Sequence, residues 1–286
     1  MRKLLVQLDP DRLPSVFDRV VAVDAGAEDV FSYGGVAEAD VQGLVHGAMF
    51  TRGPKDLKHT ALFIGGSDAT AAERLLAAAR KTFFGPFRVS VLLDPNGANT
   101  TAAAAVVKLV KAVGGSVKGR RAAVLAGTGP VGARAAGLLL RLGAEVRISS
   151  RDAARGAAAA QRIGERFKGQ VGVVTVKAPA EARPLAEWAE VLLAAGAGGA
   201  LMLARSDWAG QSGLKAIADV NAVPPLGVEG VEVADNGAER DGKLVFGALG
   251  VGGLKMKAHK AAIARLFEQN DLVLDAEEIY DLAAAL

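Results

Sequence analysis

The sequence predicts an α/β protein with two parallel-sheet lobes around a cleft, the second lobe being a Rossmann-type NADP-binding domain. Three observations predict this fold. Short aliphatic runs alternate with Ala-rich and Leu-rich runs of helical length, a pattern typical of parallel sheets with right-handed crossovers. The chain has 286 residues, enough for two domains of ordinary size. A Gly-x-Gly-x-x-Gly fingerprint lies between two predicted elements.

In the first lobe, apolar runs predict buried strands over residues 3–8, 19–23, 60–65 and 88–93. The segment 69–83 predicts a helix, because Leu75, Leu76 and Ala79 recur at helical spacing. A long Ala/Val helix is expected over 100–113, ending at Gly114-Gly115. We place the domain boundary along this helix. The first domain then comprises residues 1–105 and 270–286, and the second comprises residues 106–269.

In the second lobe, strands are expected over residues 121–126, 144–150, 171–176, 191–195 and 216–220. Helices are expected over residues 131–142, 153–167, 182–187 and 258–267. A last helix over 275–285 has Asp275 as its N-cap and two glutamates in its first turn, where negative charge is favoured.

The glycine fingerprint follows the strand 121–126 and opens the helix 131–142. It consists of Gly127, Thr128, Gly129, Pro130, Val131 and Gly132. A dinucleotide pyrophosphate binds at such a strand-to-helix turn, on the backbone N–H groups of the helix N-terminus. The strand–turn–helix–strand context makes the motif far more specific than the glycines alone.

The next strand indicates which dinucleotide binds. NAD sites usually carry an acidic residue about 20 residues after the glycines, whereas this strand ends in Ser149, Ser150 and Arg151. Hydroxyl groups and an arginine fork suit a 2′-phosphate, so we predict NADP rather than NAD. The alternative is a Gly-rich turn followed by a solvated arginine.

Three other segments are predicted to reach the coenzyme. Ala195 and Gly196 lie at the end of one predicted strand, and Asn221 follows the next. Ala248 and Gly250 lie in a Gly-rich run, residues 246–257, that we expect to be a loop lying close to the nicotinamide. Each segment also has a structural interpretation without a ligand. The segment at Ala195 would be the turn that starts a helix, the segment at Asn221 a Pro-rich turn, and residues 246–257 a flexible loop with solvated lysines.

A polar cluster follows the last strand of the first lobe. It contains Asp94, Asn96, Asn99 and Thr100. The carboxyl ends of parallel strands are where α/β sheets bind ligands, which favours a ligand-lining cluster. A turn with an N-cap for the following helix explains the same residues, and both interpretations can hold together.

Composition excludes several other classes. The formal net charge of +3 is small and dispersed, which argues against nucleic acid as a partner. Cysteine is absent, so disulfides and thiolate chemistry are excluded. The three histidines lack metal-ligand spacing, and no metal site is expected. No apolar run suits a membrane span or a signal peptide, so we expect a cytoplasmic protein.

Several blocks together resemble the bacterial NADP-dependent methylene-tetrahydromethanopterin dehydrogenases, some of which also use methylene-tetrahydrofolate. The blocks, in order, are residues 14–18, 83–90, 94–101, 124–132, 221–227, 246–257 and 275–280, with Phe267. The segment 31–53 matches this family less clearly, so the specificity for tetrahydromethanopterin or tetrahydrofolate is expected to depend on that part of the chain.

The resemblance implies a direct hydride transfer from the methylene carbon of a reduced pterin to NADP⁺. The pterin nitrogens supply the electronic push, so no general base is required. By position, Lys255 is the predicted catalytic residue and contacts the pterin; Asp18, Asp94, Asn96, Asn99 and Thr100 are weaker pterin contacts. The resemblance also implies a homo-oligomer.

Other functions remain open. Methylene-tetrahydrofolate is an alternative main substrate. A shikimate-type or bifunctional folate dehydrogenase shares the two-lobe plan, although the cyclohydrolase of the latter needs a Tyr and Lys pair, and Tyr33 is followed only distantly by Lys55 and Lys58. A non-catalytic NADPH-binding redox sensor would not need the polar cluster at residues 94–101.

Overall fold

The computed structural model describes residues 1–286 and divides into two compact units. Unit 1 comprises Met1–Thr100 and Met256–Leu286, and unit 2 comprises Thr101–Lys255. Two helices, α4 (Ala98–Ala112) and α9 (Ala248–Arg265), contain residues of both units. The assignment of one domain to the pterin and the other to the coenzyme stays a prediction. No helix combines the length and the apolar character needed to cross a lipid bilayer.

Unit 1 contains a five-stranded, fully parallel sheet in the order β12-β4-β3-β1-β2. Read from the other edge, this is the 2-1-3-4-5 order of doubly wound sheets, with its switch point between β1 and β3. Its elements are β1 (Leu4–Leu8), α1 (Val16–Asp24), β2 (Asp29–Tyr33), α2 (Glu38–Phe50), a 3₁₀ helix (Pro54–His59), β3 (Thr60–Ile64), α3 (Ala69–Thr82), β4 (Ser90–Leu93), a 3₁₀ turn (Pro95–Gly97), β12 (Val273–Leu274) and α10 (Ala276–Ala284).

Helices α2 and α3 cover one face of the unit 1 sheet. Alternate residues of the strands, such as Leu8 and Ile64, pack against Val45 of α2 and Leu75 of α3 in one buried cluster. Burial of this apolar face stabilises unit 1 by about 25 cal/mol for each Å² removed from water. The predicted helix over 69–83 and its buried face are confirmed.

One predicted strand of unit 1 is wrong. Residues 19–23 belong to helix α1, not to a strand. The β-branched run suggested a strand, but the side chain of Ser15 accepts a hydrogen bond from the Asp18 N–H and starts a helix there. Val21 and Ala22 are buried on one side of that helix while Val20 and Val23 face outward, so tertiary packing outweighs β-propensity.

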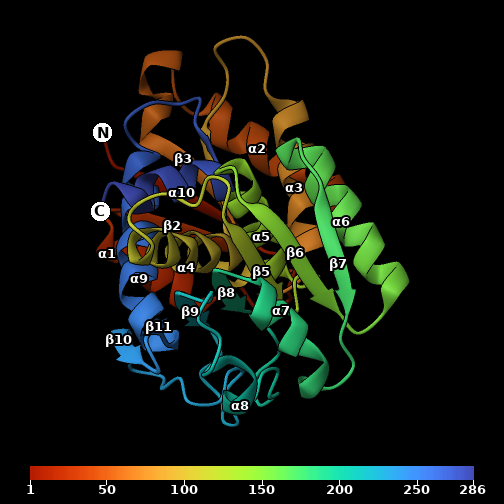
Figure 1. Cartoon of the computed structure of the whole chain (residues 1–286). Coiled ribbons are helices and arrows are strands. Elements are labelled where there is room, and N and C mark those ends of the chain that lie inside the picture. The colour runs from red at the N-terminus through yellow and green to blue at the C-terminus, as the bar shows by residue number, and fades with distance from the viewer. The chain divides into compact units, whose positions relative to one another are not determined.

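Unit 2 contains a seven-stranded sheet in the order β10-β11-β9-β8-β5-β6-β7. Counted from β5, its parallel strands have the 3-2-1-4-5-6 order of a Rossmann fold, with its switch point between β5 and β8. Figure 1 shows α6 lying alongside β7. Its elements are β5 (Arg121–Leu125), α5 (Pro130–Arg141), β6 (Glu145–Ser150), α6 (Ala153–Phe167), β7 (Val171–Thr175), a 3₁₀ helix (Pro179–Ala182), α7 (Arg183–Trp188), β8 (Val191–Ala194), α8 (Arg205–Trp208), β9 (Ala216–Asp219), β10 (Asn236–Arg240) and β11 (Lys243–Phe246).

The predicted strands and helices of unit 2 up to β9 are confirmed within a few residues, and α6 is confirmed at both ends. The antiparallel pair β10–β11 was not predicted. The predicted loop over 246–257 is wrong, because α9 begins at Ala248, ten residues before the predicted helix start. Glycine lowers helix stability by about 1 kcal/mol relative to alanine, so close packing of the helix outweighs this cost.

Candidate functional site

The glycine fingerprint forms the turn from β5 to α5 at the switch point of the unit 2 sheet. Ala126 has a left-handed backbone with φ 55°, a conformation that costs an alanine roughly 1 kcal/mol. Gly129 is the N-cap of α5, no side chain caps this helix, and Pro130 occupies its first turn. The first-turn N–H groups of a helix have no partner within the helix. The turn therefore presents backbone dipoles to an anion.

The three fingerprint glycines have different surroundings. A Cβ on Gly127 would lie 2.5 Å from Ile148 Cβ, and one on Gly132 would lie 2.7 Å from the Ala126 oxygen. These two glycines let α5 and β6 approach the turn closely. A Cβ on Gly129 would have its nearest neighbour 3.6 Å away, so Gly129 leaves space on the outer side of the turn. Room at this glycine fits the close approach of a pyrophosphate.

The end of β6 lies beside the fingerprint. Ser149 is buried, and its hydroxyl accepts a hydrogen bond of 2.9 Å from the Ala126 N–H. The Ser150 hydroxyl donates to the Asp152 backbone oxygen at 2.7 Å, so it has no second proton to donate to a ligand. Arg151 is exposed, and a second exposed arginine, Arg155, stands in the first turn of α6. Sequence analysis missed Arg155, although its place in the first turn of the predicted helix 153–167, close to Arg151, was a usable signal.

Ala195 and Asn221 lie at the same, carboxyl, edge of the sheet. The Ala195 N–H donates to the Leu125 oxygen at 3.1 Å, which brings residue 195 next to the glycine turn. Gly196 packs against Met202, where a Cβ would lie 2.5 Å from the sulfur. The Asn221 amide oxygen accepts from Val223 N–H at 2.9 Å, and its Nδ2 donates to the Pro225 oxygen at 3.4 Å and to the Ala197 oxygen, in the loop after β8, at 3.5 Å. This geometry gives Asn221 a loop-organising role.

A buried carboxylate that sequence analysis missed supports that loop. Asp219 is 1% exposed at the end of β9. Its carboxylate accepts from the N–H groups of Asn221 at 3.0 Å and Val228 at 2.9 Å. Burial raises the pKa of Asp219, against the opposing effect of these backbone bonds. The available signal was a carboxylate inside an otherwise apolar predicted strand, residues 216–220.

The N-terminus of α9 carries Ala248 and Gly250. The Gly247 N–H donates to the Asp235 oxygen at 2.8 Å, and a Cβ on Gly250 would collide with that same carbonyl group. The Asp235 carboxylate is held by two bonds of 2.7 Å from Arg240. Gly250 therefore serves close packing of backbone on backbone, and the contact of Ala248 and Gly250 with coenzyme stays a prediction. Lys255 is half-buried further along α9.

In unit 1 the polar cluster after β4 is closed by its own hydrogen bonds. The buried Asp94 carboxylate accepts from Asn99 N–H at 2.9 Å, Thr100 N–H at 3.1 Å and the Thr100 hydroxyl at 2.7 Å. The Asn99 amide donates to the Leu93 oxygen and to Asp275. Asn96 alone is exposed, in a left-handed conformation with φ 51°. Contact of these four residues with a pterin stays a prediction, and the geometry favours the capping role for all except Asn96.

Asp18 lies at the switch point of the unit 1 sheet. A Cβ on Gly65, which follows β3, would be 3.5 Å from an Asp9 oxygen and 3.7 Å from an Asp18 oxygen. His259 of α9 is fully buried there, with Nε2 4.0 Å from Asp18 Oδ1. Burial is the largest influence on Asp9 and raises its pKa. Two carboxylates and bare glycine backbone thus meet where doubly wound sheets bind ligands.

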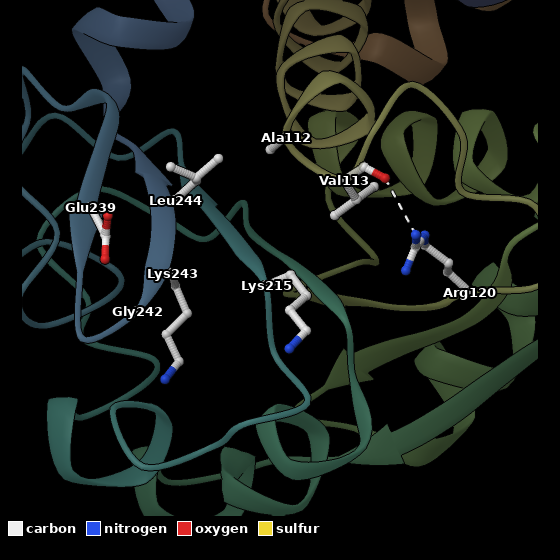
Figure 2. Close-up of a pocket in the computed structure, with 8 residues that line it drawn as sticks. All are labelled: Ala112, Val113, Arg120, Lys215, Glu239, Gly242, Lys243 and Leu244. Atoms are coloured by element: carbon white, nitrogen blue, oxygen red, sulfur yellow. Dashed lines mark hydrogen bonds between the residues drawn. The ribbon is translucent and has the colours of Figure 1, made fainter.

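A separate pocket of about 490 Å³ lies at the opposite, amino-terminal edge of the unit 2 sheet (Figure 2). Its cations are bonded to the protein's own oxygen atoms. Lys215 donates to Ser212 O at 2.7 Å, and Lys243 donates to Ala209 O at 2.5 Å. Arg120 pairs with Glu190 at 3.0 Å. The Arg120 pair joins the starts of β5 and β8, the two lysines bond to carbonyl oxygens of the segment between α8 and β9, and all three cations are engaged in structural contacts.

Comparison with known proteins relates these features to a family. A family model described as methylene-tetrahydromethanopterin dehydrogenase, N-terminal, matches residues 16–96. The NAD(P)-dependent methylenetetrahydromethanopterin dehydrogenase of Methylorubrum extorquens is 34% identical over 293 residues, covering 100% of this chain and 99% of that protein. The chain belongs to the methylene-tetrahydromethanopterin dehydrogenase family. Within this family it is 50% identical, over 282 residues, to the bifunctional protein MdtA of the same organism, covering 99% of this chain and 98% of that protein.

Solved structures agree on the fold of this dehydrogenase family member. Quinate dehydrogenase from Corynebacterium glutamicum, in complex with NAD, has a TM-score of 0.53 at 13% identity, over 100% of this chain and 99% of that one. The 5-ketofructose reductase of Gluconobacter sp. has a TM-score of 0.52 at 16% identity, over 100% and 99% of the two chains. These similarities establish the Rossmann-type α/β fold.

Proposed function

We propose that the protein transfers a hydride from methylene-tetrahydromethanopterin to NADP⁺, giving methenyl-tetrahydromethanopterin in one-carbon metabolism. The uncapped N-terminus of α5, opened by Gly129 at the switch point of the unit 2 sheet, is the observation that carries the proposal. Family membership supplies the pterin substrate, which the geometry of the glycine turn alone does not specify.

The residues present fit a dinucleotide. Backbone N–H groups at the start of α5 bind the pyrophosphate, with Gly129 giving it room. Bound NADP⁺ supplies the hydride-accepting C4 of its nicotinamide. The chain itself positions that ring, through the backbone after β8 at Ala195 and Gly196 and through the start of α9.

Preference for NADP rests on the end of β6. Arg151 is exposed directly after β6, and its guanidinium group would form charge-assisted hydrogen bonds with a 2′-phosphate. Ser149 keeps a hydroxyl proton to donate, because its oxygen is the acceptor in the bond from Ala126. Arg155 and the N-terminus of α6 add positive potential nearby.

For the pterin, we propose contacts from Asp18 and from Lys255. The Lys255 ammonium group donates a hydrogen bond to the pterin carbonyl and so orients the ring. We propose a hydrogen bond and not charge stabilisation, because the methenyl product is a cation and the positive charge of Lys255 would not stabilise it. The lone pairs of the two pterin nitrogens promote loss of hydride from the methylene carbon. The protein places that carbon next to C4 of the nicotinamide.

Steady-state assays that cross two pterins with two coenzymes test the proposal. We expect NADP⁺ reduction with methylene-tetrahydromethanopterin, and a lower kcat/KM with NAD⁺. Binding of NADPH without turnover of either pterin would contradict the proposal and favour a redox sensor.

The role of Lys255 is tested by Lys255→Met, which keeps the length of the side chain and removes its charge. We expect kcat to fall about tenfold, because one charge-assisted hydrogen bond to the substrate is lost. The Kd for NADPH should stay unchanged. Lys257→Met, two residues further along α9, is the matched control, and an unaffected kcat in Lys255→Met would remove this residue from the site.

Methylene-tetrahydrofolate is a second candidate substrate. The relative at 50% identity is named a bifunctional protein, which supports testing more than one substrate. A kcat/KM with methylene-tetrahydrofolate above that with methylene-tetrahydromethanopterin would make it the main one.

A further inference from the structure

We propose that a pocket beside α2 binds the side chain of the pterin substrate, and that Asp40 favours tetrahydromethanopterin over tetrahydrofolate there. This inference rests on the proposed function. The pocket has a volume of about 500 Å³. It lies between the loop after β2 and the first turns of α2, and its lining includes Tyr33, Gly34, Gly35, Asp40, Gly43 and Leu44.

The pocket is connected to the switch point of the unit 1 sheet through one loop. Asp9 N–H donates to Tyr33 O at 3.0 Å, and Val36 N–H donates to Asp9 O at 3.0 Å. The Asp9 carboxylate in turn accepts from Ser15 N–H at 3.3 Å, at the start of the helix that carries Asp18. If the pterin ring of the substrate lies at Asp18 and Gly65, its side chain can reach this pocket, which lies at the carboxyl end of β2, the strand next to β1.

The shape of the pocket suits a flat ring that carries a chain. Tyr33 lines the pocket and is 44% exposed. Gly43 lies on α2, and a Cβ placed there would meet no atom within 4 Å. Gly35 is equally open. Aromatic surface next to bare backbone is typical of a ligand-binding pocket.

The charge of the pocket discriminates between the two pterins. Glu38 and Asp40 stand in the first turn of α2, but Glu38 pairs with Arg74 at 2.8 Å and lies outside the pocket lining. The Asp40 carboxylate accepts one bond of 2.9 Å from Ala37 N–H. Ionised carboxylates hold about four acceptor sites, so further sites remain for a ligand.

The two pterin side chains differ in the chemistry that Asp40 meets. Directly next to its aryl ring, tetrahydrofolate carries a glutamyl group with its carboxylates, whereas tetrahydromethanopterin carries a chain of hydroxyl groups and has its anionic groups further out. A carboxylate accepts hydrogen bonds from hydroxyl groups and repels other carboxylates. The Asp40 side chain therefore favours the hydroxylated chain and disfavours the glutamyl one.

The charge argument is tested with Asp40→Asn, whose shape is preserved, and with Glu38→Gln as the matched control from the same helix turn. The ratio of kcat/KM for methylene-tetrahydromethanopterin over methylene-tetrahydrofolate should fall about tenfold in Asp40→Asn. In Glu38→Gln it should stay within about twofold of the wild type. An unchanged ratio in Asp40→Asn would overturn the role of this carboxylate.

The location is tested by filling the pocket. Gly43→Leu places a side chain in the open space, and Gly47→Leu is its matched control one turn later, where a Cβ likewise meets no atom within 4 Å. KM for methylene-tetrahydromethanopterin should rise at least about tenfold in Gly43→Leu, with little change in kcat, because uniform binding is lost. Gly47→Leu should leave KM unchanged.

The outcomes separate this inference from the function on which it rests. Equal KM values for Gly43→Leu and Gly47→Leu, in a protein whose wild type turns over both pterins, would overturn the pocket assignment alone. Wild-type protein that turns over neither pterin would overturn the proposed function and this inference together.

Discussion

Two turns of this protein each connect a parallel strand to a helix, but only one of them has a side chain that accepts hydrogen bonds from the N–H groups of the helix start. The turn from β4 to α4 in unit 1 is closed by the Asp94 carboxylate, which takes the N–H groups of Asn99 and Thr100. The turn from β5 to α5 in unit 2 has Gly129 as its N-cap and no capping side chain. A helix N-terminus that is capped internally has little left for a ligand, whereas an uncapped one attracts an anion. The difference supports our proposal that the unit 2 turn binds the coenzyme.

The largest expected effect comes from making the unit 2 turn resemble the unit 1 turn. Gly129→Asp adds a carboxylate at the N-cap of α5, where the backbone is extended and has room for a Cβ. The carboxylate caps the helix and repels the pyrophosphate, so the Kd for NADPH should rise at least about 100-fold.

Titration calorimetry measures this change, and the thermal midpoint should stay level or rise slightly. Gly129→Ala, which adds no charge, is the control and should weaken binding far less. Unchanged NADPH affinity in Gly129→Asp would contradict the assignment of the turn.

Arg151→Ala tests the proposed contact with the 2′-phosphate of NADP⁺, away from the pyrophosphate at Gly129. KM for NADP⁺ should rise by about one to two orders of magnitude, equivalent to roughly 1.5–3 kcal/mol for a lost charged hydrogen bond. Activity with NAD⁺ should stay level. Steady-state kinetics with both coenzymes provide the test, and equal losses for both would refute the 2′-phosphate contact. Arg155→Ala, measured in parallel, reports how much of the pairing the second arginine carries.

Asp94→Asn tests the closed turn. It replaces the buried oxygen that accepts from the Thr100 hydroxyl with an NH₂ group and leaves one oxygen for the N–H groups of Asn99 and Thr100. The free energy of unfolding should fall by about 2 kcal/mol. Urea denaturation measures the loss. NADPH affinity of the folded variant should match the wild type, and a specific loss of pterin binding with full stability would restore the ligand-lining interpretation of this cluster.

The smallest effect concerns the pH dependence of stability. Burial raises the pKa of Asp219 above its ordinary value of 3.8. Because folding favours the protonated carboxyl, this contribution to stability is full below the unfolded pKa and is lost as pH rises through the folded pKa. Asp219→Asn removes this titration. Its unfolding free energy, measured in urea from about pH 4 upward, should therefore fall less steeply with pH than that of the wild type. The same pH dependence of unfolding free energy in Asp219→Asn and in the wild type would contradict a raised pKa of Asp219.

Local signals predicted the fold where the chain is locally consistent. Helix α6 was predicted at both ends because Asp152 caps it, its side chain accepting from Arg155 N–H at 2.6 Å, and because an Ala-rich amphipathic run follows. The β5–α5 turn was predictable for the same reason: strand, glycines and helix agree.

Elsewhere, packing between distant segments decides the structure. Residues 248–257 form a helix because Gly247 and Gly250 let its start pack on the turn at Asp235, and no local pattern specifies that partner. Likewise, the side chain of Asn99 is engaged by Asp275, 176 residues away. The sequence therefore predicted the glycine turn between β5 and α5, and it could not show that the polar cluster after β4 is closed by its own hydrogen bonds.

The most direct test of the central claim follows the hydride itself. Methylene-tetrahydromethanopterin deuterated at its methylene carbon is incubated with the protein and NADP⁺, and the reduced coenzyme is analysed by mass spectrometry. Direct transfer should leave one deuterium in each NADPH formed, and the label should slow turnover. NADPH that contains only solvent hydrogen would contradict direct transfer between the pterin and the coenzyme.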